Sequence, residues 1–258
     1  LGLNVKGLLN IQFAIKDEEL FILEANPRAS RTMPFVAKVT GNQIIKAGTL
    51  LMLGYSIDEV RNKTKYLSSS SNKVAIKKAI FPWSRFPAED TMLGPEMKAT
   101  GEVLGVGKEF GTALNKAYAA AGVEINNKEK GIFVTLSDSE KPNFIKTVNK
   151  YLELGFTLYS TEGTGKFLKT NGIDSVIVGK ADDLGQTSLT IIEDKLVSLV
   201  INTPTYANEL SDGWKIRRLS HETGVAVVSS VREADAFIEA FLNQNLVLDD
   251  LEVIQDVS

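Results

Sequence analysis

Short apolar runs and polar breaks divide the first part of the chain into small predicted elements. Residues 8–15 and 20–24 are apolar runs with a polar stretch between them, and this pattern predicts a β-hairpin. Across residues 34–53 apolar positions recur at helical spacing, with a break near Gly41, which predicts helical packing. The polar, serine-rich residues 61–73 then predict a loop or linker.

The pattern changes beyond Gly122, where short β-rich runs begin to alternate with helical stretches. Before that glycine we expect a strand at 74–81 and a helix at 108–121. Alternation of strands and helices is typical of a parallel sheet that is covered on both faces. The expected strands are 132–136, 156–159, 175–178, 196–201 and 225–228, and the expected helices are 143–154, 164–171, 214–222 and 231–243.

These patterns predict an α/β chain. A polar, glycine-bounded stretch near residues 126–131 marks a domain boundary. We therefore expect the parallel sheet to lie in a separate domain after this stretch.

Composition excludes several classes of protein. The 258 residues are 43% hydrophobic and 24% charged, which is typical of globular chains and excludes wholesale disorder. A net charge of −3 does not favour nucleic acid or an anionic membrane as a partner. Zero cysteines exclude disulfides and thiolate sites and fit a reducing cytoplasm, and no apolar run approaches the roughly 18 to 20 residues that span a bilayer. We expect a soluble, cytoplasmic protein.

The first candidate site lies at the predicted hairpin. Gln12 and Glu24 fall on its two strands and Asn26 follows at a strand end, so paired strands would present these side chains on one face. One carboxylate and two amide oxygens are hard ligands of the kind that Mg²⁺ accepts. Arg28 and Arg31 would neutralise charge on a transferring phosphoryl group. The alternative is a surface acid whose arginine partners are merely solvated.

The second candidate site follows the strand predicted at residues 156–159. Thr161 and Thr164 lie in the segment STEGTGK, where a helix is expected to begin near Thr164. Helix N-terminal amides and adjacent hydroxyls form phosphate sites at the edge of α/β sheets. The spacing is not that of a Walker loop, so an ordinary turn with a threonine cap is the alternative.

Three segments carry a family resemblance that covers nearly the whole chain. QFAIKDEELFILEANPRASRTMPFVAKVTG resembles the metal-binding end of an ATP-grasp enzyme, in particular the second half of the carbamoyl phosphate synthetase large subunit. FPWSRFP and LGPEMKATGEV resemble the same family in the same order. The resemblance implies the end of an ATP-grasp α+β domain over residues 1–54 and a remainder of the synthetase half with a connector over 55–126. Residues 127–258 would form a Rossmann-like, methylglyoxal-synthase-like (MGS-like) regulatory domain.

The resemblance also implies a ligase reaction, in which ATP phosphorylates carbamate to carbamoyl phosphate for pyrimidine and arginine biosynthesis. Gln12, Glu24 and Asn26 would bind two Mg²⁺ or Mn²⁺ ions, and Arg28 and Arg31 would be catalytic. A separate glutaminase subunit would supply ammonia, and the full-length enzyme would be an oligomer with no nucleic-acid or membrane partner. The chain starts without methionine and shows no nucleotide-clamping segment before Gln12, so we expect a fragment that is inactive alone.

For the regulatory domain the resemblance implies binding of a nucleotide, typically UMP, as an allosteric effector. The corresponding residues are Lys141, Thr161, Thr164, Lys180, Asn202 and Thr203. Glu96 matches a position that contacts a second effector, ornithine, in some members of the family. The alternative reading is a stand-alone nucleotide-binding regulatory module without catalysis.

Overall fold

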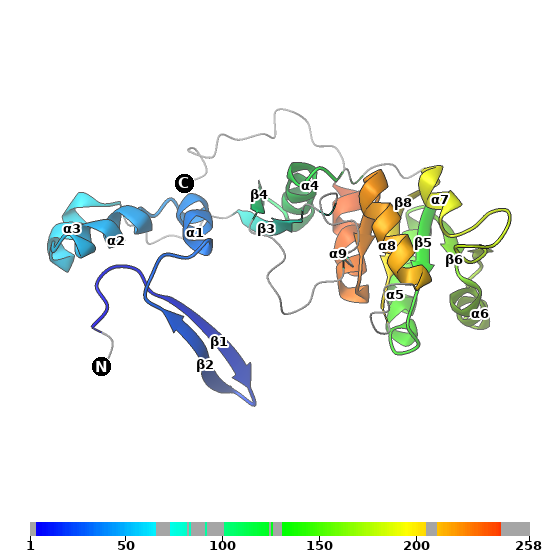
Figure 1. Ribbon diagram of the computed structural model, residues 1–258, viewed down its shortest axis with the longest axis horizontal. Helices are drawn as coiled ribbons and strands as arrows, with labels where there is room; N and C mark the ends of the chain where they lie inside the picture. The colour runs from blue at the N-terminus through cyan, green and yellow to red at the C-terminus, as the bar shows by residue number, and fades with distance from the viewer. Residues whose placement is uncertain are drawn as a thin grey trace. The chain divides into compact units, whose positions relative to one another are not determined.

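A computed structural model describes residues 4–65, 73–81, 83, 91, 101–123, 125, 131–204 and 211–243. The chain divides after Lys73 into two compact units (Figure 1). No helix among the described residues is long and apolar enough to cross a membrane.

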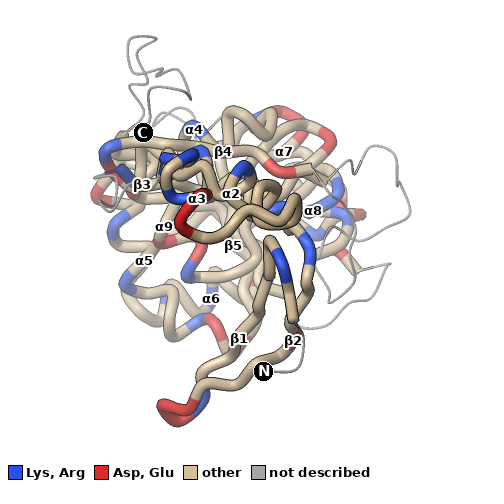
Figure 2. Tube along the Cα trace, turned by 90° about the vertical axis from the view of Figure 1, so that its left-hand side faces the viewer, with Lys and Arg blue, Asp and Glu red and all other residues tan. Residues whose placement is uncertain are grey.

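The first unit begins with the predicted hairpin, formed by β1 (Asn10–Lys16) and β2 (Glu19–Asn26), which pair in antiparallel register. Asp17 and Glu18 form its turn with φ of 51° and 65°, the left-handed values that a tight hairpin turn with right-handed strand twist requires. Acidic residues gather at this turn (Figure 2), at the opposite end of β2 from Glu24.

Three helices follow in the first unit: α1 (Thr32–Thr40), α2 (Ile44–Met52) and α3 (Ile57–Lys63). The predicted helical packing with a break near Gly41 is confirmed, because Gly41 ends α1 with a φ of 67°. The loop predicted at residues 61–73 is wrong at its start, since residues 61–63 belong to α3. A capping box between Ser56 and Glu59 begins this helix, and the polar residues 61–63 form its last turn.

The second unit contains a five-stranded parallel sheet, as predicted. Its strands are β5 (Gly131–Thr135), β6 (Thr157–Ser160), β7 (Val176–Ile177), β8 (Val197–Asn202) and β9 (Ala226–Val228). Their order in the sheet is β7-β6-β5-β8-β9. After β5 the chain adds β6 and then β7 on one side of it. It then adds β8 and β9 on the other side of β5. The gap between the carboxyl ends of β5 and β8 is therefore the topological switch point, where ligands bind in open α/β sheets.

Helices cover both faces of this sheet (Figure 1). They are α5 (Lys141–Glu153), α6 (Glu162–Thr170), α7 (Thr190–Glu193), α8 (Asp212–Thr223) and α9 (Val231–Leu242). Alternate strand residues separate two apolar clusters: Ile132 and Leu199 pack with α5, α6 and α9, whereas Phe133 and Val200 pack with α7 and α8. The four-residue α7 was not predicted from the sequence.

A second hairpin and a helix precede the parallel sheet and belong to the same unit. They are β3 (Val74–Ile80), β4 (Gly101–Gly107) and α4 (Phe110–Ala120), of which β4 was not predicted. Asn115 Nδ2 donates to the carbonyl of Ala240 at 2.7 Å, and the ring of Tyr118 meets that of Phe237 edge-on at 4.7 Å. These contacts join α4 to α9, so this segment packs with the sheet unit, whereas the sequence placed a boundary near residue 126.

Candidate functional site

The hairpin brings the three predicted metal-binding residues to one face. Gln12 and Glu24 are directly paired across the strands, so their side chains share a face of the hairpin. Asn26 lies two residues beyond Glu24, and its Nδ2 donates to Glu24 Oε1 at 3.0 Å. The amide oxygen of Asn26 therefore remains available as a ligand.

The donor set of this hairpin is small but of the right chemistry for a hard cation. It offers one carboxylate and two amide oxygens, and Gln12 and Glu24 are exposed. Across the residues with described positions there is no group of three or more His, Cys, Asp or Glu side chains that could hold a metal. Magnesium retains waters and substrate phosphates in most protein sites, so such a partial set fits an ion shared with a nucleotide.

The two predicted catalytic arginines follow the hairpin in a local turn. Arg28 N donates to the carbonyl of Asn26 at 2.8 Å, and Arg28 Nη1 donates to the carbonyl of Ala29 at 3.0 Å. Arg31 is the residue immediately before α1. Both arginines are exposed. Both arginines therefore follow within a few residues of the end of β2 that carries Glu24.

A cavity of about 580 Å³ lies at the carboxyl edge of the parallel sheet, beside the switch point. Thr135 at the end of β5 and Thr161 after β6 line it, as do Lys180 after β7 and Gly213 at the start of α8. Ligands of α/β proteins occupy this edge because strand ends and helix N-termini converge there.

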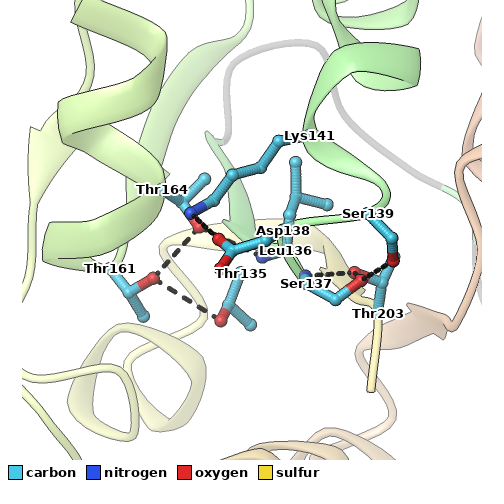
Figure 3. A network of polar contacts seen from close by, with 9 residues as sticks. All are labelled: Thr135, Leu136, Ser137, Asp138, Ser139, Lys141, Thr161, Thr164 and Thr203. Atoms are coloured by element: carbon cyan, nitrogen blue, oxygen red, sulfur yellow. Dashed lines mark hydrogen bonds and ion pairs between the residues drawn. The ribbon is translucent and has the colours of Figure 1, made fainter. Parts of the chain in front are cut away.

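Threonine hydroxyls form a short network beside the cavity (Figure 3). Thr161 Oγ1 lies 3.3 Å from Thr164 Oγ1 and 3.5 Å from Thr135 Oγ1. Thr164 is buried, and its Oγ1 accepts a hydrogen bond from the amide of Leu136 at 3.1 Å. The single Thr161 proton can go to either neighbouring threonine, whereas Thr164 Oγ1 accepts from the Leu136 amide and keeps its own proton to donate.

The N-terminus of α6 lies at this cavity, because Thr161, Glu162 and Gly163 line it. The helix begins at Glu162, two residues earlier than predicted, so Thr161 is its N-cap and Thr164 lies inside its first turn. The Thr161 side chain makes no capping hydrogen bond, because its hydroxyl faces the other threonines. By contrast, Ser211 and Ser230 cap α8 and α9. The first amides of α6 therefore remain as donors for an anion.

Lysines and carboxylates surround the phosphate-binding candidates. Lys141, whose side chain is 16% exposed, pairs with the exposed Asp138 at 2.6 Å, and its hydrogen bond lowers the pKa of that carboxyl. Glu162 pairs with Lys166 at 2.7 Å, and this hydrogen bond likewise lowers the pKa of Glu162, with a smaller effect from Lys180. Lys180 itself is exposed on the cavity wall.

On the other side of the switch point, Asn202 is the last residue of β8 and Thr203 follows it. Thr203 Oγ1 accepts a hydrogen bond from the amide of Ser137 at 2.8 Å, which ties this strand end to the loop after β5 (Figure 3). Asn202 Oδ1 accepts from Arg217 Nη1 at 2.9 Å. Both predicted residues are buried.

The structure thus places Thr161 and Lys180 on the wall of one cavity, and the buried Thr164 lies within hydrogen-bond distance of Thr161. Lys141 is paired with Asp138 and Asn202 with Arg217, and Glu96 lies outside the described residues. Sequence reasoning missed several cavity residues, namely Thr135, Asp183, Ser188, Asp212 and Ile216. Of these, Thr135 carried a usable signal, because it lies near the carboxyl end of the strand predicted at residues 132–136, where an α/β fold binds ligands.

Comparison with known proteins gives two family matches. The model for the MGS-like domain matches residues 143–229, a range that contains the strands β6 to β9 of the parallel sheet. The model for the ATP binding domain of the carbamoyl-phosphate synthase L chain matches residues 2–60, which include the hairpin and α1 to α2.

Individual relatives match across both units. The chain is 38% identical to the "Carbamoyl phosphate synthase large chain, C-terminal section" of Aquifex aeolicus, over 93% of this chain and 47% of that protein. It is 38% identical to the protein of the same name from Methanocaldococcus jannaschii, over 93% of this chain and 40% of the relative. It is 41% identical to the "Carbamoyl phosphate synthase large chain" of Brucella suis, over 93% of this chain and 21% of that protein.

The chain spans about half, or less, of the length of these curated relatives. The two family matches occur on separate units of the fold, and the pairwise matches run through both of them. The chain therefore belongs to the carbamoyl phosphate synthase large-chain family.

Proposed function

We propose that this chain provides the metal-binding end of an ATP-dependent carbamate-phosphorylating site together with a nucleotide-binding regulatory domain. The observation that carries the regulatory part is the cavity of about 580 Å³ beside the uncapped N-terminus of α6. The shared hairpin face of Gln12, Glu24 and Asn26 supports the catalytic part.

In the regulatory domain the ligand is a nucleoside monophosphate, such as UMP. Its phosphate oxygens accept hydrogen bonds from the first amides of α6 and from the hydroxyls of Thr161 and Thr164. Lys180 on the cavity wall supplies positive charge. Lys141 also does so when its ammonium group breaks the ion pair with Asp138 or contacts the phosphate and Asp138 together. Thr203 fixes the strand end beside the ligand through its hydrogen bond with Ser137.

At the hairpin, Glu24 and the amide oxygens of Gln12 and Asn26 hold Mg²⁺ or Mn²⁺ ions that ATP shares. The bound cations neutralise charge on the phosphates of ATP. Arg28 and Arg31 orient the carbamate-derived substrate and stabilise charge on the transferred phosphoryl group. The products are carbamoyl phosphate and ADP, which serve pyrimidine and arginine biosynthesis in the cytoplasm. This chain offers no cysteine nucleophile for glutamine hydrolysis, and in the proposed function a separate glutaminase subunit supplies the ammonia.

Exposed apolar side chains on the hairpin support a working enzyme in which further polypeptide covers it. Ile15, Leu20 and Ile22 are 76%, 62% and 65% exposed, which is unusual for strand residues of this size. We therefore expect additional polypeptide to cover this hairpin in the complete enzyme, for which an oligomer is also proposed.

Calorimetry with UMP and the 258-residue chain tests the regulatory part. We expect saturable heat and a higher unfolding temperature at millimolar UMP, because a ligand that binds only the folded state stabilises it. Thr161→Val is expected to weaken binding about tenfold. Thr170→Val, at the far end of the same helix, is the matched control and is expected to bind normally. No heat and no thermal shift with the unaltered chain would overturn this part.

Substitution of Glu24 in the complete large chain, assayed with its glutaminase partner, tests the catalytic part. Glu24→Gln is expected to lower carbamoyl phosphate synthesis about 100-fold or more, because a charge-neutralising ligand is lost. Glutamine hydrolysis by the partner should persist. Glu18→Gln at the hairpin turn is the control. If UMP binds but Glu24→Gln retains normal synthesis, the chain is a regulatory module and the metal assignment is wrong.

A further inference from the structure

A buried arginine and a buried asparagine meet beside the cavity at the end of β8. Arg217 on α8 is 4% exposed and Asn202 is 3% exposed. Arg217 Nη1 donates a hydrogen bond to Asn202 Oδ1 at 2.9 Å. Sequence reasoning assigned Asn202 to the ligand but gave no role to Arg217.

The contact fixes which way the Asn202 amide points. A guanidinium group carries only donors, so the atom of Asn202 that faces it must be the oxygen. In the flipped amide, an N–H group would face the guanidinium donors, and Arg217 Nη1 would lose this acceptor. The Nδ2 of Asn202 is therefore directed away from Arg217, and among the described residues it donates to no protein acceptor.

The Nδ2 group lies on the cavity side of the sheet. Asn202 pairs with Thr135 in the parallel register, so both side chains share the sheet face that α7 and α8 cover. A Cβ placed on Gly213, which lines the cavity, would lie 3.5 Å from Asn202 Nδ2 and 3.2 Å from Arg217 Nη1. The pair thus sits directly beneath the cavity wall at the start of α8.

We propose that Arg217 is a positioning residue that holds Asn202 as a hydrogen-bond donor toward an oxygen acceptor of the bound nucleotide. The acceptor is a phosphate, ribose or carbonyl oxygen, and a ligand group that presents a donor is rejected there. This inference rests on the proposed nucleotide site. It adds that, in one contact of that site, the protein is the hydrogen-bond donor and the ligand is the acceptor.

A double-mutant cycle on UMP binding tests this role. Asn202→Ala and Arg217→Met are each expected to weaken UMP binding about tenfold, because each removes the oriented donor. The double variant should also be weakened about tenfold, not about a hundredfold, because Arg217 acts through Asn202. Arg217→Lys, which keeps a charged donor, should restore part of the affinity.

The controls separate positioning from general destabilisation. Arg218→Met removes the adjacent buried guanidinium, which pairs with Glu222 at 2.7 Å, and UMP affinity should remain unchanged. Asn202→Asp retains a partner for Arg217 but has no donor, so it should fold and bind UMP at least about tenfold more weakly. This variant keeps the inference testable if Arg217→Met does not fold.

The outcomes distinguish the inference from the proposed function. Normal UMP binding by Asn202→Asp, or additive losses in the cycle, would overturn the positioning role while the nucleotide site stands. Failure of the unaltered chain to bind UMP would overturn the nucleotide site and the inference together.

Discussion

Replacement of Thr164 by valine is expected to leave a buried backbone amide without an acceptor. Thr164 is 2% exposed, and its Oγ1 accepts the hydrogen bond of the Leu136 amide at 3.1 Å. Valine has nearly the same shape but no oxygen, and Leu136 is itself buried, so water does not replace the lost acceptor. An unsatisfied buried donor costs about 1–3 kcal/mol. The free energy of unfolding should fall by about 2 kcal/mol.

Urea denaturation measures this loss directly. With a slope of about 2 kcal/mol per molar urea, the midpoint should fall by about 1 M while the slope itself stays constant. Thr170→Val is the matched control, because that exposed hydroxyl donates to a carbonyl of its own helix, Lys166 O. Its effect should stay within about 0.5 kcal/mol. Equal midpoints for the two variants would refute the assigned role of the Thr164 hydroxyl.

Two further substitutions test the packing and the electrostatics. Gly111→Ala places a Cβ against a backbone carbonyl of α9 and should lower stability by about 1–3 kcal/mol, whereas Gly163→Ala meets nothing within 4 Å and should be neutral or stabilising. Thermal unfolding compares them, and an equal response would contradict the close packing of α4 on α9. Asp138→Asn frees Lys141 from an exposed ion pair and should tighten UMP binding only about two- to fivefold, because water screens such pairs and makes them weak. Calorimetry checks this, and weaker binding would show that Asp138 serves the ligand.

The sequence predicted the elements whose signals are local. Alternating and continuous apolar runs identified β1, β2 and the strands of the parallel sheet, because strand period and length are properties of neighbouring residues. The strand β4 was missed because its sequence GEVLGVG is rich in glycine. The structure explains Gly105, because a Cβ at this position would overlap the backbone of α4. The missing side chain allows β4 and α4 to pack closely.

The composition of both candidate sites was also visible in the sequence. Glu24 and Asn26 on one strand share a face by the period of two, and Gln12 follows once the hairpin register is right. Thr161 stands after a predicted strand, where an α/β fold binds anions. In each case the position along an element fixes the direction of the side chain, so no distant contact is needed.

Only the tertiary structure decided which distant residues complete these sites. Arg217 meets Asn202 beside the cavity, and elsewhere in the fold Asn115 on α4 reaches the carbonyl of Ala240 across 125 positions of the chain. Such partners depend on strand order and helix packing, and a linear pattern of apolar and polar residues does not encode either of them directly. The sequence by itself therefore determined the elements and the residue types of the sites. The packed fold determined the walls of the cavity and the direction of the Asn202 amide.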